Sequence, residues 1–275
     1  MKVGFTFWYG DLKRSYSRIS GVKKAGFDFL EISLDYPWPL KRKERLMDVL
    51  NMVRDSGIGL AIHGPWRDIK LSSPIENIRK ASVQICKENI IEASKMKPDY
   101  ILFHLDTDQA VEEFDEIKNE VFSSSIKSVD ELLSLAESLG VDLFFENVPK
   151  KHSSPDLFEA IASRDERFLV CLDIGHAIVS EFKRNLREVK VENIFKKWKS
   201  ALGNRVKLMH LHGIKVEEKC IQKHLTMENE LLNKFKGFVN EFKIDRVVFE
   251  IFRDFKGNKV NVSDLKEAIF FLKEI

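Results

Sequence analysis

The stretch "LVCLDIGHA" (169–177) begins as an apolar, partly β-branched run and ends in polar residues. Its first four residues are typical of a strand buried on both faces, as in a parallel sheet. Asp173, Gly175 and His176 follow within four positions. A carboxylate at the end of a buried strand is costly unless something pairs with it. The stretch therefore predicts both a parallel-sheet strand and a partner for Asp173.

Eight runs of this kind are spread along the whole chain. They cover residues 3–8, 27–34, 59–66, 100–105, 142–148, 168–175, 206–213 and 246–252. Stretches with helical periodicity lie between them, for example 76–96, 124–140 and 228–242. Several of these stretches end in a glycine or proline just before the next strand, at Gly26, Gly57, Pro98 and Gly140.

The strand starts recur roughly every 25 to 45 residues, which is the spacing of strand–helix units. Eight such units in 275 residues predict an α/β fold with a single (β/α)8 TIM barrel. A doubly wound open sheet is the alternative, but it usually has fewer strands, and no glycine-rich phosphate loop follows the first strand here. Since no linker or low-complexity tract interrupts the pattern, residues 1–275 are expected to form one domain.

The amino-acid composition argues against several classes of protein function. The formal net charge is +2, from 45 basic and 43 acidic residues, so no strong overall field favours nucleic acid. The sequence has no apolar run long enough to cross a membrane, and no signal peptide is recognised at the N-terminus. The three cysteines, at 86, 171 and 220, form no CxxC pair, which suits a reducing cytoplasm.

Polar residues gather where the expected strands end, which is the side of a barrel that carries chemistry. Glu31, His63, His104, Asp106, Glu146, Asn147, Asp173, His176, His210, His212 and Glu250 all lie there, and His224 lies in the loop after the seventh strand. A single strand histidine is most often a hydrogen-bonded core residue, and Glu31 alone would be read as paired with a basic neighbour. Together, however, these residues would place several carboxylates close enough to repel one another unless a cation held them.

Mixed histidine and carboxylate ligands from separate strands suit Zn²⁺, Mn²⁺, Fe²⁺ or Co²⁺ better than Ca²⁺ or Mg²⁺. Asp173 is accordingly expected to bind a divalent metal ion. That cation would compensate the carboxylate buried at the end of its strand.

The motifs "IHGPW", "FHL", "FFENVP", "CLDIGHA", "MHLHG" and "VVFEIF" resemble those of the xylose isomerase-like TIM barrels, and the resemblance covers essentially the whole chain. That group contains sugar isomerases and epimerases as well as endonuclease IV, which acts at abasic sites in DNA. For the sugar enzymes, the resemblance implies one divalent metal held by Glu146, Asp173, His210 and Glu250. It also implies that Glu146 and Glu250 act as acid and base at a carbon next to a carbonyl.

Endonuclease IV carries three zinc ions, and its additional ligands match His63, His104, His176 and His224. The segment 63–74 is also similar to that enzyme's loop after the third strand. One position differs, because Gln222 stands where the nuclease pattern has an aspartate. The nuclease's glycine-rich, histidine-bearing loop after the first strand is also replaced by "WYGDLKRSY" (8–16).

The preferred interpretation is a divalent-metal-dependent isomerase or epimerase of a small sugar or sugar derivative, in which a metal-stabilised enediolate forms. His176 and His212 would bind substrate oxygens, and Trp8, Trp66 and Trp38 would line the pocket. Arg67, Arg253, Lys70, Lys151 and Lys215 are candidates to bind a phosphate. Packing is an equally good reading for the aromatic residues, and surface charge for the basic ones.

The alternative interpretation is an endonuclease IV-like zinc phosphodiesterase whose partner is DNA. It accounts better for the additional histidines, whereas Gln222, the first loop and the near-neutral charge argue against it. A barrel that only binds a metal or sugar is a third reading. The expected cofactor is one metal ion, with up to three conceivable, and the sequence does not fix the sugar or the oligomeric state.

Overall fold

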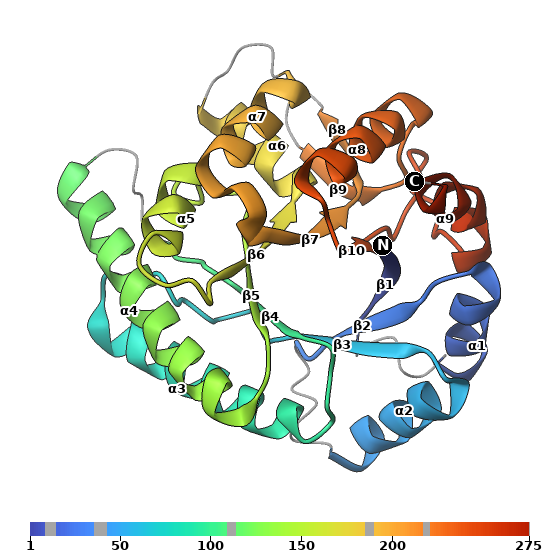
Figure 1. Ribbon diagram of the computed structural model, residues 1–275, viewed down its shortest axis with the longest axis horizontal. Coiled ribbons are helices and arrows are strands. Elements are labelled where there is room, and N and C mark those ends of the chain that lie inside the picture. The colour runs from blue at the N-terminus through green and yellow to red at the C-terminus, as the bar shows by residue number, and fades with distance from the viewer. Residues whose placement is uncertain (9–14, 36–42, 109–113, 185–189, 217–220, 275) are drawn as a thin grey trace.

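The computed structural model describes residues 1–8, 15–35, 43–108, 114–184, 190–216 and 221–274. Within these ranges, eight parallel strands close into a barrel in the order β1-β10-β7-β6-β5-β4-β3-β2. Helices surround this ring of strands (Figure 1). The fold is therefore a single (β/α)8 TIM barrel, which confirms the expectation from the sequence.

All eight expected strands are present, and the first pairs with the last, so that Val3 lies opposite Val247. Their bounds are β1 (Lys2–Trp8), β2 (Phe29–Ser33), β3 (Gly59–His63), β4 (Ile101–His104), β5 (Leu143–Glu146), β6 (Leu169–Asp173), β7 (Val206–Leu211) and β10 (Arg246–Phe249). Each run is apolar because both faces are covered. Outward-facing residues such as Leu30, Ile62 and Phe145 pack into one continuous apolar cluster with the helices.

The helices lie close to where the periodicity places them. Their bounds are α1 (Ser15–Ala25), α2 (Lys43–Ser56), α3 (Glu76–Ser94), α4 (Asp115–Leu139), α5 (Pro155–Ala162), α6 (Ile174–Arg184), α7 (Val191–Leu202), α8 (Asn229–Phe242) and α9 (Lys266–Lys273), with short 3₁₀ helices η3 (Gly203–Arg205) and η4 (Val262–Leu265). Helix α4 begins nine residues before the expected start at 124, and Asp115 and Glu116 lie favourably in its first turn. It ends at Gly140, whose φ of 65° permits the left-handed cap.

One feature was not expected from the sequence. Between β7 and α8, the chain forms an antiparallel pair of strands, β8 (Gly213–Val216) and β9 (Ile221–Leu225). This hairpin follows directly from the C-terminal end of β7 and carries His224. It therefore returns a histidine to the end of the barrel where the other polar residues lie.

The inside of the barrel contains two rows of side chains on the same strands. The lower row, called the floor here, is a separate buried cluster formed by Phe29, Ala61, Tyr100, Leu102, Phe144, Cys171, Leu208 and Val248. The upper row, called the polar row, consists of Glu31, His63, His104, Glu146, Asp173, His210 and Glu250. Each polar-row residue lies two positions after a floor residue, and side chains two apart on a strand share a face. The strand period thus places the polar row directly above the apolar floor.

Across the part of the chain that the structure describes, no helix has the length and apolar character required to cross a membrane.

Candidate metal centre and its cavity

The centre of the polar row is a cluster of four residues from adjacent strands. Glu146, Asp173, His210 and Glu250 each offer one potential ligand atom, and these atoms all lie within 4.8 Å of one another. His210 Nδ1 is 3.4 Å from Glu146 Oε2 and 3.6 Å from Glu250 Oε2. The structure therefore brings together the four residues that the sequence predicted as a metal site.

Several polar atoms in this cluster are buried without a hydrogen-bond partner among the described residues. They are both carboxylate oxygens of Glu146, Oδ2 of Asp173 and Nδ1 of His210. Buried polar atoms are normally paired, and carboxylates this close repel one another unless a cation lies between them. Two kinds of donor, carboxylate oxygen and imidazole nitrogen, fit a divalent ion such as Zn²⁺, Mn²⁺, Fe²⁺ or Co²⁺.

Asp173 is held by the junction between β6 and α6. The Asn147 side chain forms two 2.8 Å hydrogen bonds with the Asp173 backbone. Its Nδ2 donates to the carbonyl oxygen, and its Oδ1 accepts from the N–H. Oδ1 of Asp173 accepts a 2.6 Å hydrogen bond from the backbone N–H of His176, as a residue at a helix N-cap does. Helix α6 consequently begins at Ile174, and the predicted strand ends two residues early. Oδ2 stays available for a cation.

Gly175 is required at this junction because the imidazole of His212 lies against it. A Cβ at residue 175 would come within 2.0 Å of the His212 ring. His212 is fully buried, and its Nε2 lies 3.2 Å from Asp173 Oδ1. Its Nδ1 contacts the Gly213 carbonyl at 3.0 Å and the His224 backbone N–H at 3.1 Å. The ring therefore supports Asp173, and a direct contact with substrate, as expected from the sequence, is not favoured by this position.

A second cluster joins His63 and His104 to Glu146. The two Nε2 atoms are 3.1 Å apart, and they lie 3.5 and 3.4 Å from Glu146 Oε2. His63 Nδ1 is 2.8 Å from the Gly64 carbonyl oxygen, which can only accept, so Nδ1 carries the hydrogen. The lone pair of His63 Nε2 therefore points at His104 and Glu146. His63, His104 and Glu146 could therefore hold a second cation, and Glu146 belongs to both clusters.

A third cluster contains His176, His212 and His224, whose potential ligand atoms also lie within 4.8 Å of one another. His176 Nδ1 faces the carbonyl oxygen of Asn147 at 3.1 Å, and His224 Nδ1 faces that of Glu250 at 3.2 Å. In both rings the carbonyl fixes the hydrogen on Nδ1 and leaves Nε2 as the available lone pair.

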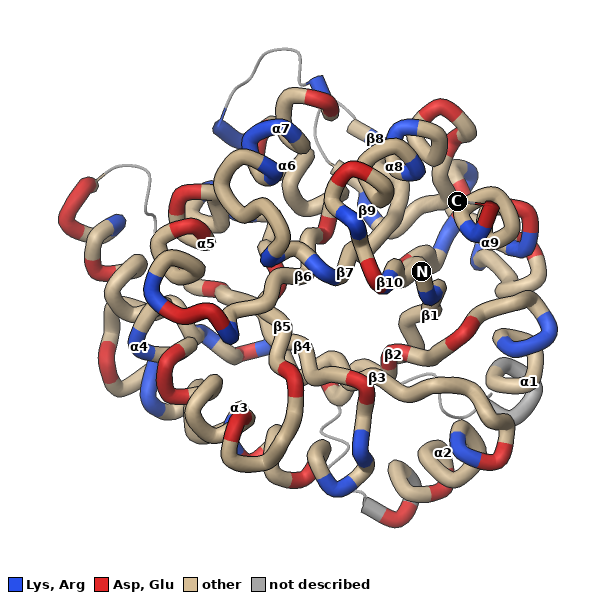
Figure 2. Tube along the Cα trace, viewed as in Figure 1, with Lys and Arg blue, Asp and Glu red and all other residues tan. Residues whose placement is uncertain are grey.

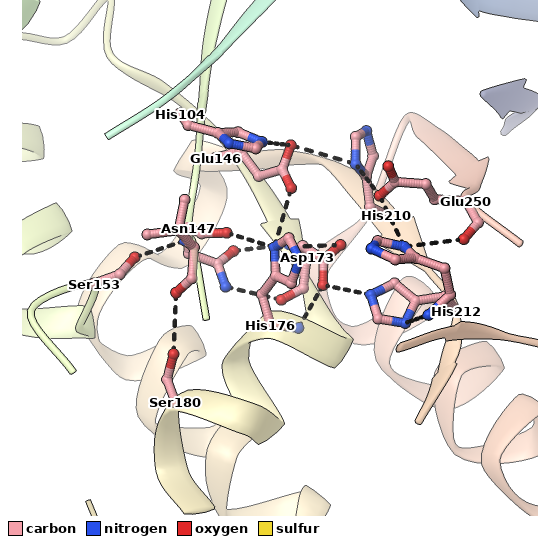
Figure 3. Close-up of polar contacts among 12 residues, drawn as sticks. His104, Glu146, Asn147, Ser153, Asp173, His176, Ser180, His210, His212 and Glu250 are labelled. Carbon is pink, nitrogen blue, oxygen red and sulfur yellow. Dashed lines mark hydrogen bonds and ion pairs between the residues drawn. The ribbon is translucent and has the colours of Figure 1, made fainter. Parts of the chain in front are cut away.

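The contacts that fix Asp173 and these rings are drawn in Figure 3, where Glu146 lies between His104 and His210. Gln222, which lies on β9 with His224, belongs to none of these clusters.

The carboxylates and histidines of the polar row shift one another's pKa values. Burial alone would raise the pKa values of Glu146, Asp173 and Glu250, but the neighbouring histidines lower all three. Burial lowers and nearby carboxylates raise the pKa of His63, and the net result is a raised value. His224 differs, because burial dominates and lowers its pKa to about 4. Ionised carboxylates thus attract protons onto several rings when no other cation is present.

A cavity of about 1320 Å³ opens above the polar row. Some residues of the clusters line this cavity. One of them is Glu250, whose side chain is 15% exposed. Trp8, Trp66, Arg67 and Arg253 line this cavity, as the sequence suggested, whereas His212 does not. Trp38 lies outside the described residues.

The cationic side chains around the cavity are mostly engaged with the protein. The Arg67 guanidinium lies 4.2 Å from the ring centroid of Trp66 and forms an ion pair with Asp35. Lys70 contacts Asp106 at 2.9 Å, and Arg253 donates to the Gly257 carbonyl at 2.8 Å. Lys151 and Lys215 do not line the cavity. These partners weaken the expectation that the lysines and arginines form a dedicated phosphate site.

The role of Glu31 differs from the one expected from the sequence, which was an ion pair with a basic neighbour. Glu31 is fully buried and lies 3.1 Å from His210 Nε2. The only sequence signal was its place at a strand end, because its partner is 179 positions away.

Known proteins resemble this chain in sequence. An uncharacterised protein of Methanocaldococcus jannaschii, MJ1614, is 27% identical over 245 residues, which cover 82% of this chain and 84% of the relative. A probable endonuclease 4 of Aquifex aeolicus is 22% identical over 271 residues, covering 94% of both chains.

The fold is also that of a crystal structure described as a D-tagatose 3-epimerase-like protein. The TM-score is 0.72 at 17% identity, with 100% of this chain and 99% of that chain covered. A family model described as xylose isomerase-like TIM barrel matches residues 19–275. The chain therefore belongs to the xylose isomerase-like TIM barrel family.

Proposed function

We propose that this protein is a divalent-metal-dependent isomerase or epimerase of a small sugar or sugar derivative. The observation that carries the proposal is the cluster of Glu146, Asp173, His210 and Glu250, with unpaired ligand atoms, at the base of a large cavity. The resemblance to a D-tagatose 3-epimerase-like protein supports the substrate class.

A metal ion bound by these four residues would polarise a carbonyl and a neighbouring hydroxyl of the sugar, which makes the intervening C–H more acidic. Glu250 reaches the cavity, and its lowered pKa keeps the carboxylate ionised, which is the form that a general base needs before it accepts a proton. Glu146, which flanks His210 as Glu250 does, would take the proton of the neighbouring hydroxyl and deliver it to the same or the adjacent carbon, while Glu250 would return its proton to that oxygen. His176 lines the cavity, and the lone pair on its Nε2 would accept a hydrogen bond from a substrate hydroxyl.

The test is solvent exchange at carbon. Protein loaded with Mn²⁺ or Co²⁺ is incubated in D₂O with a panel of ketoses and aldoses, and deuterium incorporation is followed by NMR. Glu250→Gln should slow exchange by roughly 10²–10⁴-fold, the usual effect of losing a general acid or base. Glu267→Gln, the same change at an exposed position on α9, is the matched control and should leave the rate unchanged.

A second candidate, hydrolysis of phosphodiesters at abasic sites in DNA, is favoured by one specific observation. His63 Nε2 and His104 Nε2 converge on Glu146 Oε2, an arrangement that a single-metal isomerase does not need. Lysines and arginines are interspersed with acidic residues on the helices around the barrel, and no block of positive charge stands out in this view (Figure 2).

The two candidate functions predict different effects of His104→Asn on activity and on metal content. An isomerase of the proposed type retains deuterium exchange when His104 is replaced, because the four central residues are intact. A phosphodiesterase loses one metal ion per chain and its cleavage of a duplex with an abasic site. Cleavage of that duplex by the unmodified protein, with no exchange for any sugar, would contradict the first proposal.

A further inference from the structure

Glu31 is the member of the polar row that belongs to none of the candidate metal clusters. Its carboxylate nevertheless has both oxygens engaged. Oε1 accepts a 3.2 Å hydrogen bond from the Thr6 hydroxyl, and Oε2 accepts one of 2.8 Å from the Tyr100 hydroxyl. His210 Nε2 lies 3.1 Å from the same Oε2. In the described part of the chain, no lysine or arginine forms an ion pair with Glu31, so the histidine is its partner.

This contact determines which nitrogen of His210 faces the carboxylate cluster. A neutral imidazole has one N–H and one lone pair, and a carboxylate that already accepts from Tyr100 favours the N–H. The hydrogen therefore belongs on Nε2, and the lone pair on Nδ1. Nδ1 is buried without a hydrogen-bond partner and faces Glu146 and Glu250. His210 is thus the reverse of His63 and His176, whose Nδ1 atoms face backbone carbonyls.

Glu31 is itself held from below by the floor. The Tyr100 ring is completely buried and packs edge-on against Phe29 and Phe144, with centroids 6.2 and 5.2 Å away. Burial and the nearby carboxylate of Glu31 raise the pKa of Tyr100 well above its ordinary value, so the hydroxyl remains a donor. The chain Tyr100–Glu31–His210 therefore connects the rigid floor to the centre of the polar row.

We propose that Glu31, fixed by Thr6 and Tyr100, is a positioning residue that sets the tautomer and ring orientation of His210 so that Nδ1 binds the metal. The inference rests on the proposed central metal site but not on the identity of the substrate. Carboxylates that hold a metal-binding histidine in this way typically change metal affinity by 10–100-fold when they are removed.

The first measurement is the tautomer of His210. The full-length protein is labelled with ¹⁵N-histidine, and long-range ¹H–¹⁵N NMR is recorded without metal and with one equivalent of Zn²⁺. The expected result is a hydrogen on Nε2 and zinc on Nδ1. A spectrum in which zinc occupies Nε2 of His210 would overturn the proposal.

The second measurement is the zinc dissociation constant, obtained by competition with a chromophoric chelator. Glu31→Leu should weaken binding by roughly 10–100-fold and redistribute the His210 tautomers. Glu31→Gln keeps a carbonyl acceptor for Nε2–H and should recover most of the affinity. Tyr100→Phe removes only the hydroxyl, so it tests the same chain of contacts in a variant whose packing is preserved.

The stability of the metal-free variants separates positioning from a structural role. Glu31→Leu removes the acceptor of two buried hydroxyls and one partner of the Glu31–His210 pair, so it should lower the free energy of unfolding. Glu31→Gln keeps an acceptor and should lose less stability, and a variant that stays folded but binds zinc more weakly shows a positioning role. An unchanged zinc dissociation constant in both Glu31→Leu and Tyr100→Phe would overturn the proposal. The expected tautomer and affinities without any sugar turnover would instead contradict only the proposed function.

Discussion

The floor and the polar row occupy the same inner faces of the same strands, two residues apart, yet they have opposite chemistry. Phe144 lies below Glu146, Cys171 below Asp173 and Leu208 below His210. The floor contains two buried polar groups: the Tyr100 hydroxyl, which donates to Glu31, and the Cys171 thiol, which interacts with His210. In the polar row, three of the described side chains, Glu146, Asp173 and His210, contain buried atoms without a hydrogen-bond partner.

This difference separates the residues that stabilise the barrel from those that form its candidate metal site. Burying an aliphatic or aromatic side chain contributes about 1.5–3 kcal/mol, so the floor stabilises the fold. Burying carboxylates and imidazoles costs free energy that their mutual attraction recovers only in part. The polar row is therefore expected to limit the stability of the metal-free protein. Ligand binding, which satisfies those atoms, should recover it.

The largest expected effect is on stability, from a truncation in the floor. Phe144→Ala removes a ring that contacts Tyr100 and should lower the free energy of unfolding by about 3–5 kcal/mol. Equilibrium denaturation in urea, with metal removed by chelator, measures this change. Phe144→Leu keeps most of the volume and should cost less than about 1.5 kcal/mol. A loss below 1 kcal/mol for the alanine variant would mean that the floor does not anchor the barrel.

The polar row should respond chiefly through metal binding. Glu146→Gln removes the carboxylate shared by the first and second clusters, and we expect metal affinity to fall by more than about 100-fold. The free energy of unfolding without metal should also fall, because the histidines that lower the pKa of Glu146 lose their buried partner. Calorimetric titration with Zn²⁺ and urea denaturation of the same preparation give both numbers. Strong destabilisation with unchanged metal binding would reverse the assignment of the two rows.

Much of this architecture is readable from the sequence, for a physical reason. Strands that are covered on both faces are continuous apolar runs, so all eight were recognisable without knowledge of their partners. Parallel strands present their C-terminal ends at one side, so residues as far apart as Glu146 and Glu250 were expected to meet. Boundaries were less certain, and β6 ends at Asp173 because that side chain caps α6.

The features that the sequence did not reveal depend on contacts between distant segments. The hairpin β8–β9 is short and largely polar, and its strands lack the apolar run that marks the barrel strands. The pairing of Glu31 with His210 joins two strands that are not neighbours in the barrel, β2 and β7, and no local pattern indicates it. The burial of His212 against Gly175 depends likewise on how α6 begins.

The smallest predicted effect is a pH dependence that distinguishes the rings of the polar row. The pKa values of His63 and His212 are raised because nearby carboxylates outweigh burial, and the pKa of His210 is raised by Cys171 together with Glu31 and Glu146. A histidine whose pKa is higher in the folded state stabilises the fold fully below its unfolded pKa of about 6.5, and this contribution is lost as the pH rises through the folded pKa. The metal-free protein should therefore lose stability as the pH rises from about 6.5 to 9.

Thermal unfolding in chelator across that range measures the slope. His63→Asn should reduce it, whereas His224→Asn should not, because burial lowers the pKa of His224 to about 4 and keeps that ring neutral throughout. Saturating Zn²⁺ should abolish the slope, since a bound cation replaces the protons that the carboxylates hold on the rings. A metal-free protein that becomes more stable between pH 6.5 and 9 would show that the carboxylates of the polar row do not hold protons on these histidines. The unpaired atoms of that row would then need an explanation other than a missing cation.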